Sequence, residues 1–350
     1  MNDIIYKSRF LSTLACFITR VRYRNFNKEV EKRAACDIFD YKGIAQPLPK
    51  YFEEILTDNN CFGMGRNLRI YSGVKNHYIT SFVEHGYFFG KYVPRQETIT
   101  FAKQILTFGD IRKETLESQV KNKRIIPIGP YIHYAPLFYN EVKMTELKKK
   151  LGKTLLVFFS HPATGCSVNF DVDYIVSKIE AIRDNFDSVI ISLFWSDISS
   201  ETVKILEEKG YIIFSAGHRY DYYFLSRLKT IISLADVTMS NNIGTHIAYC
   251  TYMGKSHWIV RQEITYVSKN GGGEGNLSIV KQIKQDPSSF NEKEELMNTF
   301  ADYKDCLSDE QKRVASKYFG FNHIKSQKQM RNILLQIDYE FRTENKLSVE

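Results

Sequence analysis

The sequence has no long hydrophobic run. No apolar stretch approaches the roughly 20 residues that a membrane-spanning helix needs. The composition, with 43% hydrophobic and 25% charged residues, is instead typical of a globular protein. A cationic start followed by a long apolar core is also missing, because the apolar piece 11–18 is short and arginines follow it at once. We therefore expect no signal peptide.

Cysteine pairs, metal motifs and nucleic-acid signatures are absent as well. The six cysteines are scattered without a Cys-x-x-Cys spacing, which predicts neither a zinc site nor a disulfide framework and favours a reduced, cytoplasmic protein. Asp171 and Asp173 have the Asp-x-Asp spacing, but they stand where they would cap a helix, so no metal is expected. No zinc-finger, basic-zipper or RNA-recognition signature occurs, and nucleic acid is not an expected partner. No internal repeat is present.

What the sequence does have is length, aromatic residues and positive charge. With 350 residues the chain is long enough for two domains of ordinary size. Its formal net charge is +8 and its aromatic fraction 14%, and the basic residues are spread along the chain. A basic balance of this kind suits an anionic small ligand or an anionic surface.

The segment 8–35 is basic and partly amphipathic. Apolar residues recur from Phe10 to Val21, and arginines and lysines accompany them from Arg20 to Arg33. Such a segment can lie on an anionic membrane surface, which would give contact with the inner face of the membrane. The alternative is a solvated helix packed on its own domain.

A first α/β domain is predicted over residues 1–145. Strand-like runs at 78–83, 103–108 and 124–128 surround a helical segment, which is typical of a parallel sheet. The first run delivers Glu84, His85 and Gly86 to its carboxyl end, where open α/β sheets place their ligands. His85 is therefore a candidate general base, with Glu84 as the carboxylate that orients it. The alternative is a structural histidine.

A second α/β domain is predicted over residues 152–300. Strands near 154, 188, 211, 237 and 257 alternate with helix-sized segments, which predicts a doubly wound sheet. Residues 301–350 are helical in pattern and are expected to pack back on the two domains. The glycine-rich loop 271–275 either closes over a ligand or is a surface loop.

The polar turn 240–245 joins the strand near 237 to a helix, so it forms a helix N-terminus. Unpaired backbone N–H groups and partial positive charge make such a turn suitable for phosphate. Hydroxyl, amide and imidazole side chains can add donors, and the turn with the first residue of the helix provides Ser240, Asn241, Asn242, Gly244, Thr245 and His246. The alternative is that Ser240 and Thr245 only cap the helix while Gly244 makes a tight turn.

These features together resemble glycosyltransferases of the GT-B type. The similarity is to bacterial enzymes of surface polysaccharide synthesis, including O-antigen and capsule. Glu84-His85-Gly86 looks like a first-domain pattern of the CDP-glycerol glycerophosphotransferase-like group. Ser160-His161-Pro162 resembles the His-Pro motif that binds the nucleotide phosphate in sialyl- and Kdo-transferases, and Ser240-Asn241 falls near their serine-rich turn. The resemblance implies two Rossmann-like domains with a cleft between them.

The resemblance also implies a mechanism. The second domain would hold a nucleotide-activated sugar donor, with its phosphates near fixed N–H groups, hydroxyls and a protonated histidine. His85 would deprotonate a saccharide or lipid-linked acceptor, giving inversion without a bound metal or other cofactor. The candidate donor-site residues are Ser160, His161, Thr164, Gly165, His218, Asp221, Ser240, Asn241, Asn242, Gly244, Thr245 and His246. The alternatives are a CDP-polyol phosphotransferase, a non-catalytic scaffold with this fold, and a nucleotide-sugar epimerase.

Overall fold

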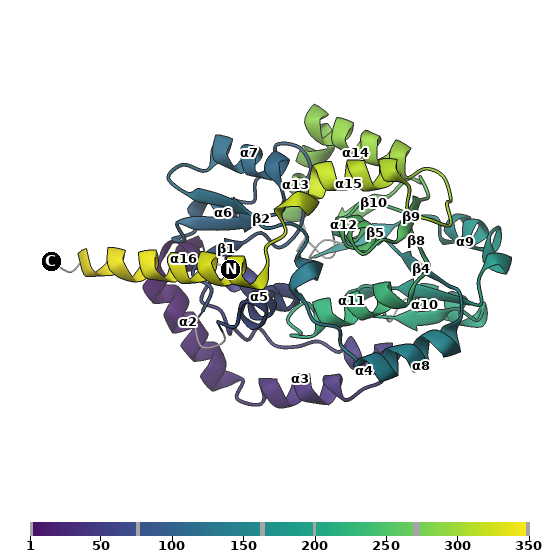
Figure 1. Ribbon diagram of the computed structural model, residues 1–350, viewed down its shortest axis with the longest axis horizontal. Coiled ribbons are helices and arrows are strands. Elements are labelled where there is room, and N and C mark those ends of the chain that lie inside the picture. The colour runs from purple at the N-terminus through teal and green to yellow at the C-terminus, as the bar shows by residue number, and fades with distance from the viewer. Residues whose placement is uncertain (1–2, 75–77, 162–164, 199–200, 269–273, 348–350) are drawn as a thin grey trace.

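The computed structural model describes residues 3–74, 78–161, 165–198, 201–268 and 274–347. These residues form two units, each built on a parallel sheet flanked by helices (Figure 1). The C-terminal helices lie against both units. The predicted fold class, α/β with two Rossmann-like domains and C-terminal helices, is confirmed.

The first unit contains a three-stranded parallel sheet in the order β1-β2-β3. Its N-terminal helices run along one edge of the molecule, and α4 reaches the second unit, where the Tyr41 hydroxyl donates to Glu207. The elements are α1 (Asp3–Lys7), α2 (Arg9–Arg22), α3 (Phe26–Ala34), α4 (Tyr41–Ile44), η1 (Thr57–Gly63), α5 (Met64–Ser72), β1 (Phe82–Val83), α6 (Arg95–Ile99), β2 (Gln104–Thr107), α7 (Asp110–Gln119), β3 (Arg124–Pro127) and η2 (Tyr131–Tyr134).

Strand β1 is shorter than the strand predicted at 78–83. The backbone before it is bound by side chains instead of a neighbouring strand. The Ile79 N–H donates to Glu54 Oε2, and the Asn59 amide donates to the carbonyl of Ser81. Because these groups are already satisfied, pairing with β2 begins only at Phe82.

The second unit contains a five-stranded parallel sheet in the order β7-β6-β4-β8-β9, as the predicted doubly wound pattern requires. A separate antiparallel pair, β5 and β10, lies beside it. The elements are α8 (Glu141–Leu151), β4 (Thr154–Phe158), β5 (Cys166–Asn169), α9 (Val172–Glu180), η3 (Arg183–Asn185), β6 (Ser188–Ser192), η4 (Trp195–Asp197), α10 (Glu201–Glu208), β7 (Ile212–Phe214), α11 (Phe224–Leu234), β8 (Val237–Ser240), α12 (Thr245–Tyr252), β9 (Ser256–Ile259), β10 (Thr265–Ser268), α13 (Glu274–Gln285) and α14 (Pro287–Thr299).

The central strand β4 is buried on both faces. Leu155 and Val157 pack with the side chains of α9 and α10, while Leu156 and Phe158 point to the opposite face and pack with α11 and α12. A strand covered by helices on both sides has no polar face, which explains its unbroken apolar sequence.

The chain returns to the first unit at its end. Helix α15 (Asp309–Phe319) packs on α12 of the second unit and on α7 of the first, and η5 (Phe321–His323) leads into α16 (Gln327–Leu347). Helix α16 packs on α5, with Met330, Leu334 and Ile337 buried. The last helix of the chain therefore belongs to the core of the first unit.

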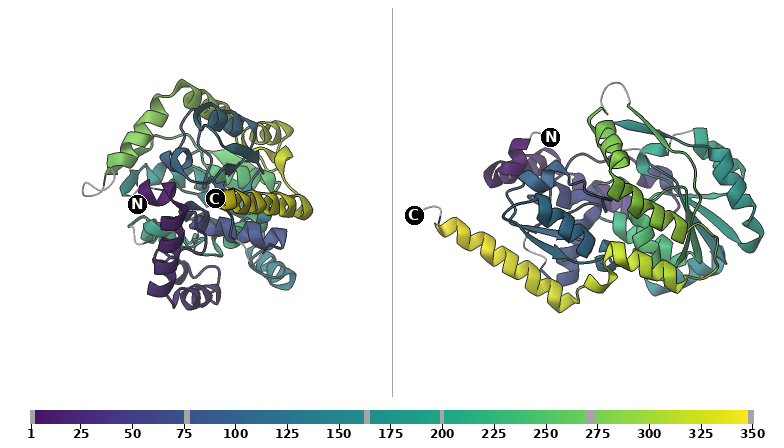
Figure 2. Two further views of the ribbon diagram at one scale, coloured as in Figure 1. Left: turned by 90° about the vertical axis from the view of Figure 1, so that its left-hand side faces the viewer. Right: turned by 90° about the horizontal axis from the view of Figure 1, so that it is seen from above.

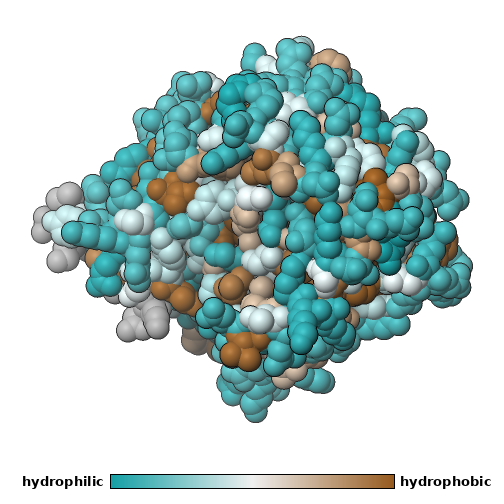
Figure 3. Space-filling model, turned by 45° about the vertical axis from the view of Figure 1, so that its right-hand side comes forward, coloured by the Kyte–Doolittle hydropathy of each residue, from teal (hydrophilic) through white to brown (hydrophobic). Residues whose placement is uncertain are grey.

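The face of the molecule shown in Figure 3 is predominantly hydrophilic. On the face shown in Figure 3, hydrophobic side chains emerge in small groups among hydrophilic ones. None of the helices that the structure describes combines the length and the apolar composition needed to cross a membrane.

Candidate functional site

A cavity of about 350 Å³ lies where the two units meet. Its second-unit wall includes the residues at the carboxyl ends of β4, β6 and β8, together with side chains of α11, α12 and β10. Since β6 and β8 flank β4 on opposite sides, these segments leave the sheet at its topological switch point, which is where open α/β sheets bind ligands. Its volume is at the lower end of the range of about 300–1,000 Å³ for small-molecule sites.

The start of α12 faces this cavity. Gly244 is the N-cap and has no side chain to bond the first turn. A Cβ at Gly244 would lie 2.9 Å from Nδ1 of His246, so glycine leaves room for that ring. Asn242, Gly244, Thr245 and His246, four of the six residues proposed for donor binding here, line the cavity. The open N-terminus of α12 thus carries partial positive charge into the cavity wall.

Thr245 also joins the two units. The backbone N–H of Tyr87 donates to Thr245 Oγ1 over 3.1 Å. A Cβ at Gly86 would lie 3.6 Å from the same oxygen, so the first unit approaches the start of α12 closely. Thr245 is therefore a contact between the units as well as a lining residue.

Two histidines of the second unit line the cavity. The His246 ring stacks on Phe158 with centroids 5.0 Å apart, and burial, with His161 nearby, lowers the pKa of His246 to about 3. Burial thus disfavours the protonated form of His246, so this residue does not fit the expectation of a protonated histidine at the donor phosphates. His161 is exposed and stacks on Phe194, with centroids 4.6 Å apart.

His85 reaches the cavity from the first unit, immediately after β1. The acidic group beside it is Asp58 of η1, whose pKa is raised by burial and lowered by the interaction with His85. The Tyr6 hydroxyl also bonds to Asp58. Asp58 was not predicted, because it is 27 positions away in the sequence and follows no strand.

The prediction that Glu84 orients His85 is wrong. Its Oε1 accepts from Nε of Arg112 over 2.6 Å, and its Oε2 accepts from the hydroxyl of Thr107, also over 2.6 Å. Glu84 and Arg112 are both fully buried. Consecutive residues of an extended chain point to opposite sides, so Glu84 faces the interior while His85 faces the cavity.

Ser240 and Asn241 support the site from behind. Ser240 is fully buried, donates to the carbonyl of Asn242 and contacts Nε2 of the buried His257 over 2.9 Å. Asn241 accepts through Oδ1 from both the N–H and the hydroxyl of Ser160, a residue that does line the cavity. Direct binding through Ser240 or through Oδ1 of Asn241, as predicted, is thus wrong, because these groups hold the turn and the end of β4 together. The Nδ2 of Asn241 is buried and has no hydrogen-bond partner among the described residues.

His218 and Asp221 are not part of the cavity wall. Asp221 is fully buried, and its Oδ2 lies 3.0 Å from Nη1 of the equally buried Arg227. His218 packs against Trp195, and burial beside Arg219 and Arg33 lowers the pKa of His218 to about 4. Their predicted donor-binding role is wrong, since both residues are engaged in the core.

The remaining predicted residues lie next to the site or outside the described chain. Gly165 has φ +78° just before β5 and does not contribute to the described cavity wall. Thr164 lies outside the described residues, as do residues 271–273 of the glycine-rich loop 271–275. The loop's suggested closure over a ligand therefore stays a prediction.

Sequence reasoning missed the aromatic wall of the cavity. The aromatic residues, which come from both units, are Phe62, Phe88, Phe158, Phe159, Phe194, Phe224, Tyr249 and Tyr266. Phe159 directly follows β4, and Phe194 is the second residue after β6, so the strand-end rule was a usable signal for both. The others resemble ordinary core residues in the sequence.

The described residues that line the cavity include no Lys, Arg, Asp or Glu. Within the described parts of the chain, no three His, Cys, Asp or Glu side chains are grouped so as to hold a metal ion. The polar groups available to a ligand are thus imidazoles, hydroxyls, an amide and backbone N–H groups.

Comparison with known proteins assigns the chain to no family. No family model and no curated protein matches the chain. Among solved structures, similar ones include a UDP-GlcNAc 2-epimerase from Neisseria meningitidis bound to UDP-GlcNAc, with 11% identity and a TM-score of 0.35 over 71% of this chain and 63% of that chain. Medicago truncatula UGT71G1 complexed with UDP-glucose has 12% identity and a TM-score of 0.33, over 69% of this chain and 55% of that one.

A third similar structure is a UDP-glucose:anthocyanidin 3-O-glucosyltransferase in complex with UDP. It has 10% identity and a TM-score of 0.32, over 81% of this chain and 69% of that chain. The chain thus spans less than two thirds of the length of the first two structures. Similarity at this level assigns no activity to the chain.

Proposed function

We propose that the chain is a glycosyltransferase that moves a sugar from a nucleotide-activated donor to a saccharide or lipid-linked acceptor. One observation carries the proposal: His85 of the first unit and the open N-terminus of α12 of the second face the same cavity at the switch point of the sheet. A base and an anion-binding element that line one cavity are what group transfer from a phosphate requires.

The second unit would hold the donor. Its phosphates would lie at Gly244 and Thr245, where the partial charge of α12 and the backbone N–H groups favour an anion. As the glycosidic bond breaks, negative charge collects on the leaving phosphate, and donors already in place stabilise it without rearranging. No metal enters this scheme.

The first unit would supply the base. His85 takes the proton of the acceptor hydroxyl while the hydroxyl oxygen attacks the anomeric carbon and the nucleotide departs. A single displacement of this kind inverts the configuration. The apolar walls exclude water, which favours transfer over hydrolysis. The motif resemblance extends the proposal to synthesis of a cell-surface polysaccharide.

The donor site is tested by thermal unfolding with UDP, GDP, CDP, CMP, dTDP and ADP. A ligand at about 100 times its Kd adds roughly 2.7 kcal/mol to stability. We expect one nucleotide class to raise the melting temperature selectively. A flat response to the whole panel contradicts the donor site.

Catalysis is tested with His85→Ala. Turnover should fall by about 10²–10⁴-fold while the nucleotide-induced thermal shift is kept. His323→Ala is the matched control, because His323 pairs with Asp110 and does not line the cavity.

Two outcomes would favour the alternative functions. A product that carries phosphorus would favour the polyol phosphotransferase, and nucleotide binding without turnover would favour the scaffold.

A further inference from the structure

Helix α2 carries a row of exposed apolar side chains. Phe10, Leu14, Phe17, Ile18 and Val21, here called the α2 row, recur at helical spacing along one side. Phe10 is 74% exposed and Phe17 64%. The row extends over about 16 Å at about 1.5 Å per residue. Figures 1 and 2 show α2 at the periphery of the molecule.

The opposite side of α2 already holds the helix on the protein. Cys16 is buried, and its thiol bonds to the carbonyl of Glu54. The Arg20 guanidinium donates to the carbonyls of Phe52 and Glu53. Since these contacts fix α2, folding does not require the α2 row, and its large side chains need another explanation.

Positive charge accompanies the row. The segment 4–28 contains six basic residues and no acidic one. Arg22, Arg24 and Lys28 are exposed, and none of them forms an ion pair within the described part of the chain. The C-terminal end of the row therefore meets a group of uncompensated cations.

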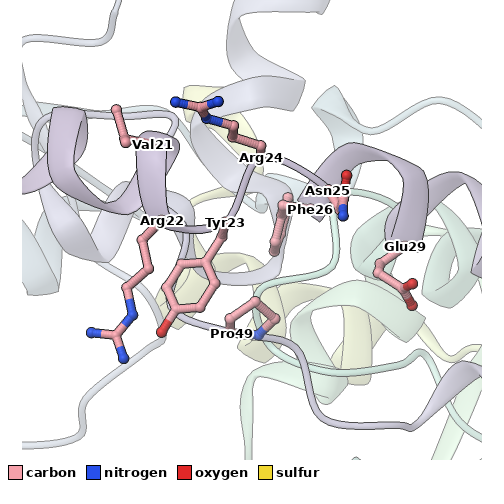
Figure 4. A pocket seen from close by; sticks show the side chains of 8 residues that line it. All are labelled: Val21, Arg22, Tyr23, Arg24, Asn25, Phe26, Glu29 and Pro49. Atoms are coloured by element: carbon pink, nitrogen blue, oxygen red, sulfur yellow. The ribbon is translucent and has the colours of Figure 1, made fainter.

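These cations do not converge on one point. A hollow of about 340 Å³ lies where α2 turns into α3, lined by Val21, Arg22 and Arg24 among others. Figure 4 shows the Arg22 and Arg24 side chains pointing away from each other. Such an arrangement suits a surface with many anions better than a single bound phosphate.

We propose that α2 lies flat on an anionic lipid surface. The α2 row enters the boundary between head groups and acyl chains, and Arg22, Arg24 and Lys28 contact lipid phosphates. A second copy of the chain fits this face less well, because a two-fold pair of α2 helices would bring two acid-free basic segments together. This inference does not depend on the proposed transferase activity.

The apolar contribution is tested by co-sedimentation of the purified chain with vesicles. The vesicles are phosphatidylcholine alone, or phosphatidylcholine mixed with an equal amount of phosphatidylglycerol. We expect binding to the mixed vesicles, and at least about tenfold weaker binding for Phe10→Ser with Phe17→Ser. The matched control is Val142→Ser with Phe290→Ser, which alters equally exposed side chains on α8 and α14 and should leave binding unchanged.

The charge contribution is tested on the same vesicles. Arg22→Gln and Arg24→Gln should each weaken binding by about fivefold, and added salt should weaken binding of the unaltered chain. Lys149→Gln, on the exposed side of α8, should have no effect. Absence of binding, or equal binding of all variants, would overturn the proposal. So would a dimer that the Phe10 and Phe17 changes dissolve, because a second copy would then cover the row.

Insertion of the α2 row into the lipid boundary is tested separately, by tryptophan fluorescence. Phe17→Trp should show a blue shift of its emission when the mixed vesicles are added, because the indole moves from water into the lipid boundary. Val142→Trp, equally exposed on α8, should show none. An unchanged Phe17→Trp spectrum with bound vesicles would contradict insertion of the α2 row.

Discussion

Two acidic residues of the first unit lie near the candidate base in very different surroundings. Glu84 precedes His85 in the chain, yet Arg112 and Thr107 hold its carboxylate in the interior. Asp58 is distant in the chain, yet it is the acid whose charge interacts with His85. Its Oδ2 is buried and accepts no hydrogen bond from the described residues. A buried carboxylate with spare bonding capacity is suited to stabilise a charged imidazole.

Asp58→Asn should therefore slow catalysis without affecting the donor site. We expect turnover to fall by about 10²-fold, the lower end of the range for general acid–base help, because the acceptor proton would then be taken up without the carboxylate that lies beside His85. The thermal shift produced by the nucleotide should stay unchanged. The control is Asp184→Asn, an exposed residue of η3. Full turnover in Asp58→Asn would exclude this residue from the mechanism.

Glu97 gives the protein a pH-dependent stability. Burial and the charge of Glu84 raise the pKa of Glu97 well above its usual range. The folded state then holds a proton that the unfolded state releases, so stability is full below the unfolded pKa and is lost as pH rises through the folded pKa. The free energy of unfolding should therefore fall between mildly acidic and mildly alkaline solution.

Glu97→Gln should remove this loss, because the amide stays neutral. Urea unfolding at about pH 5 and about pH 8 should show a smaller difference for the variant than for the unaltered chain, with the gain in stability at the higher pH. Glu117→Gln, which changes an exposed residue of α7, is the control. Equal pH dependence in all three proteins would contradict the assignment.

At the scale of elements, the start of α12 concentrates the features that a phosphate site needs. Its N-cap lacks a side chain, its first turn faces the cavity, and its first residue, Thr245, is held by the other unit. The position of the helix is therefore set from both sides of the cavity. A change at the N-cap should act on ligand binding more than on folding.

Gly244→Ala tests this expectation. The backbone at Gly244 is extended, which any residue adopts, but the new methyl group would displace the His246 ring from its place in the cavity. We expect nucleotide affinity to fall by about tenfold, equivalent to about 1.4 kcal/mol. The control is Gly275→Ala, where a Cβ meets nothing within 4 Å. Unchanged affinity in Gly244→Ala would argue against phosphates at this turn.

Most elements of the second unit could be predicted from hydrophobic pattern. Strands such as β4 and β6 are unbroken apolar runs because helices cover both faces, and helices such as α11 repeat apolar residues at helical spacing. The strand predicted at 78–83 was too long, because only Phe82 and Val83 pair with β2. Glu54 and Asn59 bind the backbone of Ile79 and Ser81 before it, and no local pattern signals hydrogen bonds from such distant side chains.

At the scale of the whole molecule, the two units are joined through the end of α15. Gly320 has φ +67° and ends α15 against the backbone of the first unit. A Cβ at Gly320 would lie 2.4 Å from the carbonyl oxygen of Phe108. Only glycine permits both this conformation and this approach.

Gly320→Ala should therefore destabilise the protein by two separate effects. Gly210→Ala isolates the first, since Gly210 also has positive φ but a Cβ there meets nothing within 4 Å. We expect Gly210→Ala to cost about 1 kcal/mol in backbone strain. Gly320→Ala should cost about 1–3 kcal/mol more, because the backbones must also separate. Denaturant unfolding measures both, and equal losses would show that the close approach contributes nothing.

The candidate site could be predicted only in part, because the cavity forms between the units. The strand-end rule found His85, Ser160, His161 and the start of α12, which the fold does bring together. The rule does not distinguish side chains of a turn that face the cavity from those that are buried in the protein interior. Ser240 and Asn241 are of the second kind. Phe62 and Phe224 meet across the units with ring centroids 4.7 Å apart, which the sequence of neither unit reveals.

The return of α16 to the first unit bears on how the chain is made. During synthesis α5 and β2 emerge well before Met330, Leu334 and Ile337, which complete their core. N-terminal domains generally fold first on the ribosome. Here the core of the first unit can close only after the second unit and α16 have also been translated.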